Sequence, residues 1–154
     1  MLLTTVTYLR NNNQLLMLHR VKKENDINAG YWLGVGGKFE AGETPYEAAR
    51  REITEETGFI VDDLIVQGIV TFVYPDKPTH YIFVFRGDIA ETDFRQTREG
   101  ILEWVDADKV MDLALWEGDK LFLPYVLDEK DEAFSLKLVY DENDNLLEYH
   151  FDNV

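Results

Sequence analysis

The stretch GGKFEAGETPYEAARREITEETGF, Gly36 to Phe59, decides the fold of this 154-residue chain and carries most of its chemistry. Its second half predicts a helix over Thr44–Thr57, because Thr44 and Glu47 form a T-x-x-E capping box and Pro45 occupies the first helical position. The glycine that follows this segment stands where a helix C-terminal glycine belongs. The stretch therefore predicts a glycine-containing loop that leads into a helix with both ends marked.

Three glutamates crowd one face of this helix. Glu52, Glu55 and Glu56 stand at positions i, i+3 and i+4, which point the same way. Three like charges so close destabilise a helix unless a cation compensates them, and Arg51 alone cannot neutralise all three. Hard divalent ions such as Mg²⁺ or Mn²⁺ suit an all-carboxylate cluster. The alternative is a surface helix with a solvated acidic face, which the segment REITEE by itself would favour.

The residues before the helix strengthen the interpretation as a metal site. Gly36 and Gly37 allow close backbone approach, so that the Gly36 carbonyl can join the metal ligands. Lys38 follows directly and can contact phosphate oxygens. A phosphate ester would then bridge the metals, which polarise phosphorus and activate a water molecule.

The composition limits the classes of function. Hydrophobic residues make up 45% and charged residues 29%, and the length suits one domain over residues 1–154. A formal net charge of -15 disfavours binding of a nucleic-acid polymer. The absence of cysteine excludes disulfides and thiolate sites, and no run is long enough for a membrane span. We expect a soluble, cytoplasmic protein; the sequence carries no signal for its oligomeric state.

Alternating patterns and turn residues predict many strands and a few helices in mixed order. The predicted strands are 2–9, 14–20, 31–35, 64–74, 81–89, 101–105, 134–140 and 146–151, with short helices over 106–113 and 117–127. The motifs DEKDE (128–132) and DENDN (141–145) read as solvated turns. This is an α+β pattern with helices covering a curved mixed sheet.

The opening stretch also resembles a known family motif. Reading from Gly37, the chain has five residues, Glu43, seven residues, Arg51-Glu52, an apolar residue, Thr54, two glutamates, Thr57, a glycine and an apolar residue. This resembles the Nudix box of the Nudix hydrolase superfamily, including its MutT-like members, at every defined position. The resemblance implies an α/β/α sandwich that cleaves a nucleoside diphosphate linked to another moiety, with Mg²⁺ as cofactor and Mn²⁺ as a substitute.

The resemblance also implies roles for individual residues. It assigns metal binding to Glu52, Glu55, Glu56 and the Gly36 carbonyl, and the contact between loop and helix to Glu43 and Arg51. The general base is one of the box glutamates or a glutamate from a later loop, and the sequence does not choose among them. Glu99, in TREGILEWV, is the candidate for that later glutamate and a further metal ligand; Glu103 competes with it.

A second, narrower resemblance lies in LWEGDKLFLPYVL, Leu115 to Leu127. It is similar to the segment of the Nudix enzymes for oxidised purine nucleoside triphosphates in which Trp-Pro-Asp-Asp precedes an aromatic helix. There the tryptophan stacks on the base and the acids contact its edge. Trp116 and Asp119 match this segment, whereas Gly118 replaces one of the acids. Leu33 stands where those enzymes have an asparagine that contacts the base.

The sequence also allows expectations for the other aromatic residues and for two histidines. Phe72 and Tyr74 lie on one face of a predicted strand and either line the base pocket or pack in the core. We expect Trp32 and Trp104 in the core, and His19 and His80 as packed or exposed residues.

The resemblances imply an enzyme that hydrolyses a nucleoside triphosphate to the monophosphate and pyrophosphate, with 8-oxo-dGTP as favoured substrate and a role in sanitising the nucleotide pool. ADP-ribose, a dinucleoside polyphosphate or an ordinary dNTP is the alternative substrate. A third interpretation is a non-catalytic module that senses nucleotides or binds proteins; the intact box argues against it, because a degenerate box would then be expected.

Overall fold

The computed structural model describes residues 1–21, 26–95 and 100–153, and their strands form one mixed sheet. The strands are β1 (Leu2–Asn11), β2 (Gln14–His19), β3 (Trp32–Leu33), β4 (Val35–Lys38), β5 (Ile65–Val73), β6 (His80–Asp88), β7 (Ile101–Asp106), β8 (Phe134–Tyr140) and β9 (Leu146–Asn153). The helices are α1 (Pro45–Thr57), the 3₁₀ helix η1 (Ala107–Asp112) and α2 (Asp119–Leu127).

The strand order is β3-β2-β1-β6-β5-β8-β9, while β4 pairs with β1 and β7 with β2. The pairs β1–β6 and β5–β8 are parallel, and the other pairs are antiparallel. Strands from the beginning and the end of the chain thus share one sheet. The mixed sheet confirms the predicted fold class.

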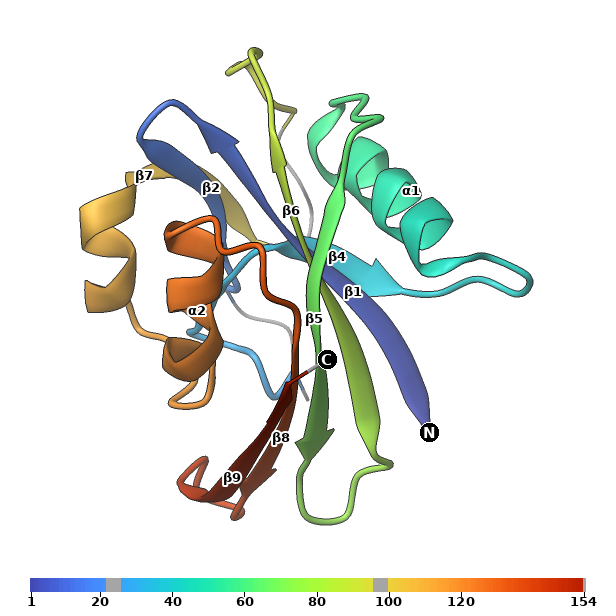
Figure 1. Cartoon of the computed structure of the whole chain (residues 1–154), viewed down its shortest axis with the longest axis vertical. Coiled ribbons are helices and arrows are strands. Elements are labelled where there is room, and N and C mark those ends of the chain that lie inside the picture. Colours follow the sequence, from blue (N-terminus) through green and yellow to red (C-terminus); the bar gives the residue numbers. More distant parts are fainter. Residues whose placement is uncertain (22–25, 96–99, 154) are drawn as a thin grey trace.

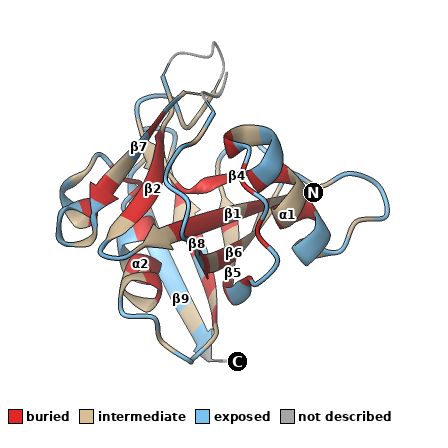
Figure 2. Cartoon of the chain, turned by 90° about the horizontal axis from the view of Figure 1, so that it is seen from above, coloured by how far each residue is buried: buried red, intermediate tan, exposed pale blue. Residues whose placement is uncertain are grey.

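The helices cover opposite faces of the sheet and make an α/β/α sandwich. Figure 1 shows α1 on one side of the strands and α2 on the other, and Figure 2 shows the buried residues concentrated between these layers. Strand β1 serves both sides, because successive side chains of a strand point to opposite faces. Tyr8 packs in the cluster that contacts α2, together with Phe122, whereas Leu9 packs in the cluster beneath α1, together with Ile53.

Helix α1 begins and ends as the sequence predicts. Thr44 Oγ1 accepts a hydrogen bond from the Glu47 backbone N–H at 3.1 Å, and the Glu47 carboxylate accepts one from the Thr44 N–H at 2.9 Å. Gly58 ends the helix with a φ of 84°, which favours glycine. Ala49, a residue of α1, is fully buried in the cluster between the helix and the sheet, and this packing holds α1 in place.

The prediction of one strand over residues 31–35 is wrong. Strand β3 pairs with β2, whereas β4 pairs with β1, and the chain passes from one neighbour to the other at Gly34. Gly36 and Gly37 consequently lie within β4 and not in a loop. The segment after β7 is a 3₁₀ helix, which the periodicity of six residues does not distinguish from an α-helix.

Two tryptophans expected in the core are only half buried. Trp32 stacks on His19, with ring centroids 4.4 Å apart, and the indole nitrogen of Trp104 donates to the Thr92 carbonyl at 2.9 Å. Within the described ranges, no helix is long and apolar enough to cross a membrane.

The capping box makes a testable contribution to stability. Replacing Thr44 by Ala removes the acceptor for the Glu47 N–H, and we expect a loss of about 1 kcal/mol in the free energy of unfolding. Urea titration measures this loss, with Thr71→Ala, on β5, as the control. An unchanged midpoint for Thr44→Ala would show that packing alone determines where the helix begins.

Candidate active site

Arg51 is the centre of the hydrogen-bonding network on the face that carries α1. Its Nε and Nη2 donate to the two carboxylate oxygens of Glu43 at 2.7 and 2.9 Å. Nη2 also donates to the Lys38 carbonyl at 2.9 Å, and Nη1 donates to Glu52 at 2.9 Å and Glu55 at 3.2 Å. One guanidinium therefore ties the segment before the helix to two of the three clustered glutamates.

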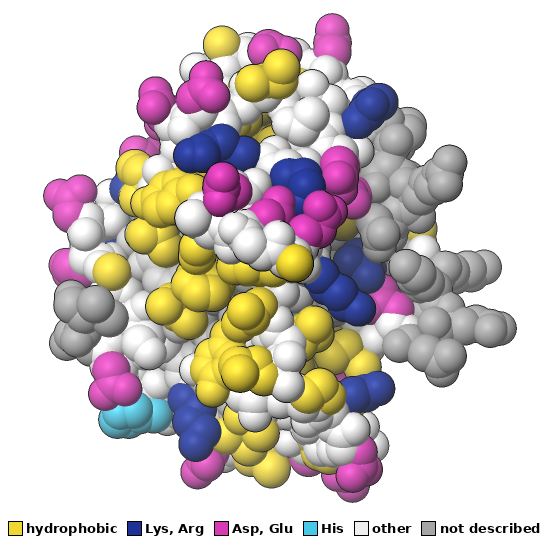
Figure 3. Space-filling model, turned by 90° about the vertical axis from the view of Figure 1, so that its right-hand side faces the viewer, with side chains coloured by type: hydrophobic (Ala, Val, Ile, Leu, Met, Phe, Trp, Pro, Cys, Tyr) yellow, Lys and Arg dark blue, Asp and Glu magenta, His cyan; other side chains and the backbone are white. Residues whose placement is uncertain are grey.

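The ion pair between Glu43 and Arg51 shifts both groups toward their charged forms. The hydrogen bond from Arg51 lowers the pKa of Glu43, and the hydrogen bond to Glu43 raises the pKa of Arg51. The bidentate geometry is specific to a planar guanidinium, which a lysine cannot reproduce. Figure 3 shows acidic and basic side chains close together on this side of the molecule, above a group of hydrophobic side chains.

Glu52 is the most buried of the clustered glutamates, with 9% of its surface exposed. Burial raises the pKa of Glu52, Arg51 lowers it, and the neighbouring Glu55 and Glu56 raise it further. A side chain at Gly37 would come within 2.6 Å of a Glu52 carboxylate oxygen, so the backbone of β4 lies directly against this group. Gly37 is therefore required by the close approach of strand and helix.

The donor chemistry of this region fits a hard divalent cation. Glu52 and Glu55 each use one carboxylate oxygen for Arg51, and the other oxygen has no hydrogen bond within the described part of the chain. Glu56 is half buried on the same helix. In residues 1–21, 26–95 and 100–153, no three acidic or histidine side chains already form a metal-binding group. The carboxylate oxygens that a hard cation prefers are present on α1, but Arg51 binds one oxygen of Glu52 and one of Glu55 in this arrangement.

Two glutamates from later in the sequence were candidates for the general base. Glu99 lies outside the described residues. Glu103 is exposed on β7, where it pairs with Met17 of β2. The choice of general base stays a prediction.

A cavity opens on the α2 side of the sheet and continues to β4. Five of its lining residues were predicted as site residues: Leu33, Gly36, Phe72, Trp116 and Asp119. Gly37 also lines the cavity and contacts Glu52, so the cavity adjoins the glutamate cluster at β4. Lys38 and Tyr74 are not among the lining residues.

Several lining residues were not predicted. Thr4, Val6 and Tyr8 alternate along β1, and this period of two could have revealed a common face. Asn28 and His80 also line the cavity, and no pattern in the sequence marks either of them. His80 accepts or donates a hydrogen bond with the Thr4 hydroxyl at 2.6 Å. Burial, with a smaller effect of Lys38, lowers the pKa of His80 to about 4, so its imidazole is neutral at pH 7.

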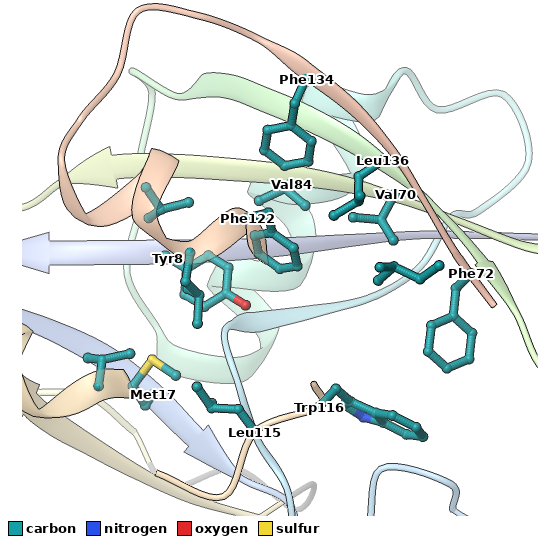
Figure 4. Packing of buried hydrophobic residues seen from close by; sticks show 14 of the residues in the cluster. Tyr8, Met17, Val70, Phe72, Val84, Leu115, Trp116, Phe122, Phe134 and Leu136 are labelled. Atoms are coloured by element: carbon teal, nitrogen blue, oxygen red, sulfur yellow. The ribbon is translucent and has the colours of Figure 1, made fainter. Parts of the chain in front are cut away.

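Trp116 forms one wall of the cavity within a cluster of aromatic rings, and only 2% of its surface is exposed. Phe72 packs edge-on against it at 5.2 Å, and Figure 4 shows the two side chains next to each other at one end of the buried cluster. Tyr31 stacks on the indole at 4.5 Å but, unlike Trp116, does not line the cavity. The indole nitrogen donates to the Asn28 side-chain oxygen at 2.8 Å.

Position 118 holds a glycine where the related segment has an acid, and the space around this position is too small for a side chain. A side chain there would overlap Leu138 and come within 2.6 Å of the Tyr140 hydroxyl. The Tyr140 oxygen instead accepts a hydrogen bond from the Gly118 N–H at 2.8 Å. A tyrosine from β8 therefore occupies the space that a second acid would need.

Asp119 is the buried acid of the cavity, with 9% of its surface exposed and no hydrogen bond to its carboxyl group from any described residue. Burial raises the pKa of Asp119 to about 7. Burial and the proximity of Asp119 also raise the pKa of Tyr8 and of Tyr140, so both phenols stay protonated. Asp119 can accept a hydrogen bond when ionised and donate one when protonated.

The sequence model of the NUDIX domain matches residues 2–126. The chain belongs to the Nudix family. It is a MutT-like Nudix hydrolase, and the motif Gly37–Phe59 is its Nudix box.

This Nudix hydrolase is similar to proteins of several organisms. It is 33% identical over 133 residues to the oxidized purine nucleoside triphosphate hydrolase of Danio rerio, covering 86% of this chain and 84% of that protein. The Mus musculus protein of the same name is 30% identical, covering 82% and 81%. The crystal structure of a MutT protein from Bacillus halodurans is 30% identical and matches with a TM-score of 0.87, covering 99% of this chain and 98% of the other.

The raised pKa of Asp119 predicts how the stability of this Nudix hydrolase depends on pH. Below its unfolded pKa near 4, Asp119 is neutral in both the folded and unfolded states. As pH rises toward 7 the unfolded state ionises first, so the folded state progressively loses stability relative to it. Asparagine does not titrate. We expect Asp119→Asn to gain stability relative to wild type between about pH 4 and 7, and to keep that gain above pH 7.

Thermal unfolding of both proteins at several pH values measures this difference. Asp131→Asn, at an exposed position, is the control for the loss of one carboxylate. A constant difference between Asp119→Asn and wild type would contradict a buried carboxyl that ionises near neutral pH.

Proposed function

We propose that this chain hydrolyses a purine nucleoside triphosphate to the monophosphate and pyrophosphate, with 8-oxo-dGTP as its favoured substrate. Its role would be to remove oxidised nucleotides from the cytoplasmic pool before they enter DNA. The names of the relatives in Danio rerio and Mus musculus support this substrate class. Residues 1–154 are proposed to form one domain, because β8 and β9 follow the matched residues 2–126 and pair into the same sheet.

One observation carries the proposal: a cavity with an aromatic wall and a single buried acid adjoins the carboxylates of the Nudix box. Trp116 lines the cavity, and its indole would stack on a purine ring. Asp119 lines the cavity without a hydrogen bond to its carboxyl group from any described residue, as a group that recognises a polar ring edge would. The triphosphate would then extend past Gly37 toward Glu52.

The phosphate end of the site would be served by the box residues. Glu52, Glu55 and Glu56, with the Gly36 carbonyl, would hold Mg²⁺, or Mn²⁺ in its place; a bound ion would polarise the phosphoanhydride and lower the pKa of a water. Glu99 stays a proposed further ligand or base. Arg51 and Glu43 would keep the box residues in place. Lys38 would place its charge near the phosphates.

Asn28 is a candidate for the polar contact with the base that Leu33 cannot make. Asn28 uses its side-chain oxygen for the Trp116 indole, and its side-chain nitrogen donates no hydrogen bond to any described residue. That nitrogen can donate to an acceptor on the base. Asn28 would supply the donor that Leu33 lacks, while Asp119 would keep the role of the acid in the related segment. Tyr74, which lies behind Trp116, would support the aromatic wall with Phe72.

An ordinary purine dNTP is the second candidate substrate. Leu33 and Gly118 both lack the polar groups that the resemblance associates with the oxidised base. A nucleotide-sensing module is the third candidate. It would bind nucleotide tightly in the presence of Mg²⁺ without turnover.

The metal-binding assignment predicts a loss of rate without a loss of fold. We expect Glu52→Gln and Glu56→Gln to lower kcat by about 10²- to 10⁴-fold, because an amide is a weaker ligand for a hard cation and a weaker base. Removal of divalent ions with EDTA should abolish wild-type turnover, and added Mg²⁺ should restore it. Pyrophosphate release and circular dichroism are the measurements.

Glu148→Gln, at an exposed position of β9, is the matched control for that experiment. It should keep the wild-type rate. If both box variants also turned over at the wild-type rate, the metal site would lie elsewhere.

The substrate assignment predicts selectivity that depends on the base pocket. We expect kcat/KM for 8-oxo-dGTP to exceed that for dGTP, dATP and ADP-ribose. Because a site built around hydrogen bonds loses discrimination when they are removed, Asn28→Leu should lower this preference by about 10-fold. Pyrophosphate or phosphate release from the four compounds in parallel measures it. A metal-dependent preference for another compound would support the hydrolytic mechanism but contradict a role in removing oxidised nucleotides from the pool.

A further inference from the structure

We propose that Asp144, at the tip of the β8–β9 hairpin, is a positioning residue that holds Trp116 in place through Tyr31 and Tyr74. This inference rests on the proposed function where it concerns substrate binding. Its structural part, the restraint on Trp116, is independent of which nucleotide the site binds. We call Asp144, Tyr31 and Tyr74 the Asp144 network.

The hydrogen bonds converge on one carboxylate from two distant parts of the chain. The Tyr31 hydroxyl donates to Asp144 Oδ2 at 2.8 Å, and the Tyr74 hydroxyl donates to Asp144 Oδ1 at 2.6 Å. The Tyr74 hydroxyl also lies 3.2 Å from the Glu142 carbonyl. Both oxygens of one carboxylate therefore bind one tyrosine each, and the hairpin is attached to the end of β5 and to the segment before β3.

Both tyrosine rings pack on Trp116 from outside the cavity. Tyr31 stacks on the indole with centroids 4.5 Å apart, and Tyr74 packs edge-on at 6.1 Å. Neither ring lines the cavity, whereas Trp116 does. Movement of either tyrosine would consequently free the indole on the side away from the substrate.

The backbone at Asp144 supports a specific need for its side chain. Asp144 has a φ of 63°, a left-handed conformation that glycine adopts without strain and that other residues adopt less readily. The turn thus contains an aspartate where glycine would be easier to accommodate. The turn was expected to be merely solvated, but Asp144 is half buried. The hydrogen bonds with the two tyrosines account for the burial.

The same hairpin contacts Trp116 a second time, through Tyr140. Its ring lies 4.9 Å from the indole. Tyr140 and Asp144 both follow residue 126, where the match to the NUDIX domain ends. The C-terminal hairpin, which lies beyond the matched residues, therefore supports Trp116 from two positions.

A positioning role predicts an effect on substrate binding and not on the chemical step. Loss of the Asp144 carboxylate would let Trp116 sample other orientations, so KM should rise while kcat stays the same. We expect Asp144→Gly to raise KM by about 10-fold, the size of effect expected when one hydrogen bond is lost from binding. Asp144→Asn, which keeps one acceptor oxygen, should have a smaller effect.

Asp144→Gly is the central variant because it removes the carboxylate and fits the left-handed turn. Asp76→Gly is its matched control, since Asp76 is an exposed aspartate in another turn with a φ of 60°. Tyr31→Phe and Tyr74→Phe remove only the hydroxyls. Each should raise KM in the wild-type protein and add little in the Asp144→Gly protein, because the network acts as a unit.

The Trp116 indole N–H resonance in the nucleotide-free protein is the second readout, assigned with Trp116→Phe. The proposal expects this resonance to shift or broaden in Asp144→Gly and to stay unchanged in Asp76→Gly. An unchanged resonance together with an unchanged KM would overturn it, as would a fall in kcat with KM and the resonance unchanged. If the wild type hydrolysed no nucleotide, the proposed function would fail, and the resonance alone would decide the role of Asp144.

Discussion

The arrangement of the glutamate cluster on α1 depends on one guanidinium. Arg51 holds both oxygens of Glu43, one oxygen each of Glu52 and Glu55, and the carbonyl of Lys38. Without this cation the crowded carboxylates would repel one another and the loop would lose its attachment to α1. The planar, multidentate geometry of arginine makes one residue sufficient for five acceptors.

The sheet links this charged region to an apolar one on its opposite face. Successive residues of β1 supply Tyr8 to the cavity side and Leu9 to the α1 side, and β4 brings Gly37 against Glu52 while it also borders the cavity. Two different environments thus meet at β4. The first is the aromatic packing around Trp116, and the second is the cluster of carboxylates on α1.

Much of α1 was predictable because its signals are local. The capping box, the proline at the start, the glycine at the end and the i, i+3, i+4 spacing of glutamates all act within one or two helical turns. The contact between Arg51 and Glu43 followed from the family motif and not from spacing. The split of residues 31–35 into β3 and β4 was missed, because it depends on which neighbouring strand each half pairs with.

The sequence by itself determined the family, the helix and the residue types that can bind a cation, because those properties are encoded in adjacent positions. Only the tertiary structure decided the surroundings of Trp116. Asn28 and Tyr140 contact its ring from segments that are distant in sequence, and Asp144 binds the two tyrosines that pack on it. The overlap of a side chain at Gly118 with Leu138 exists only after β8 has paired. Such contacts arise from packing between elements, and no periodicity along the chain records them.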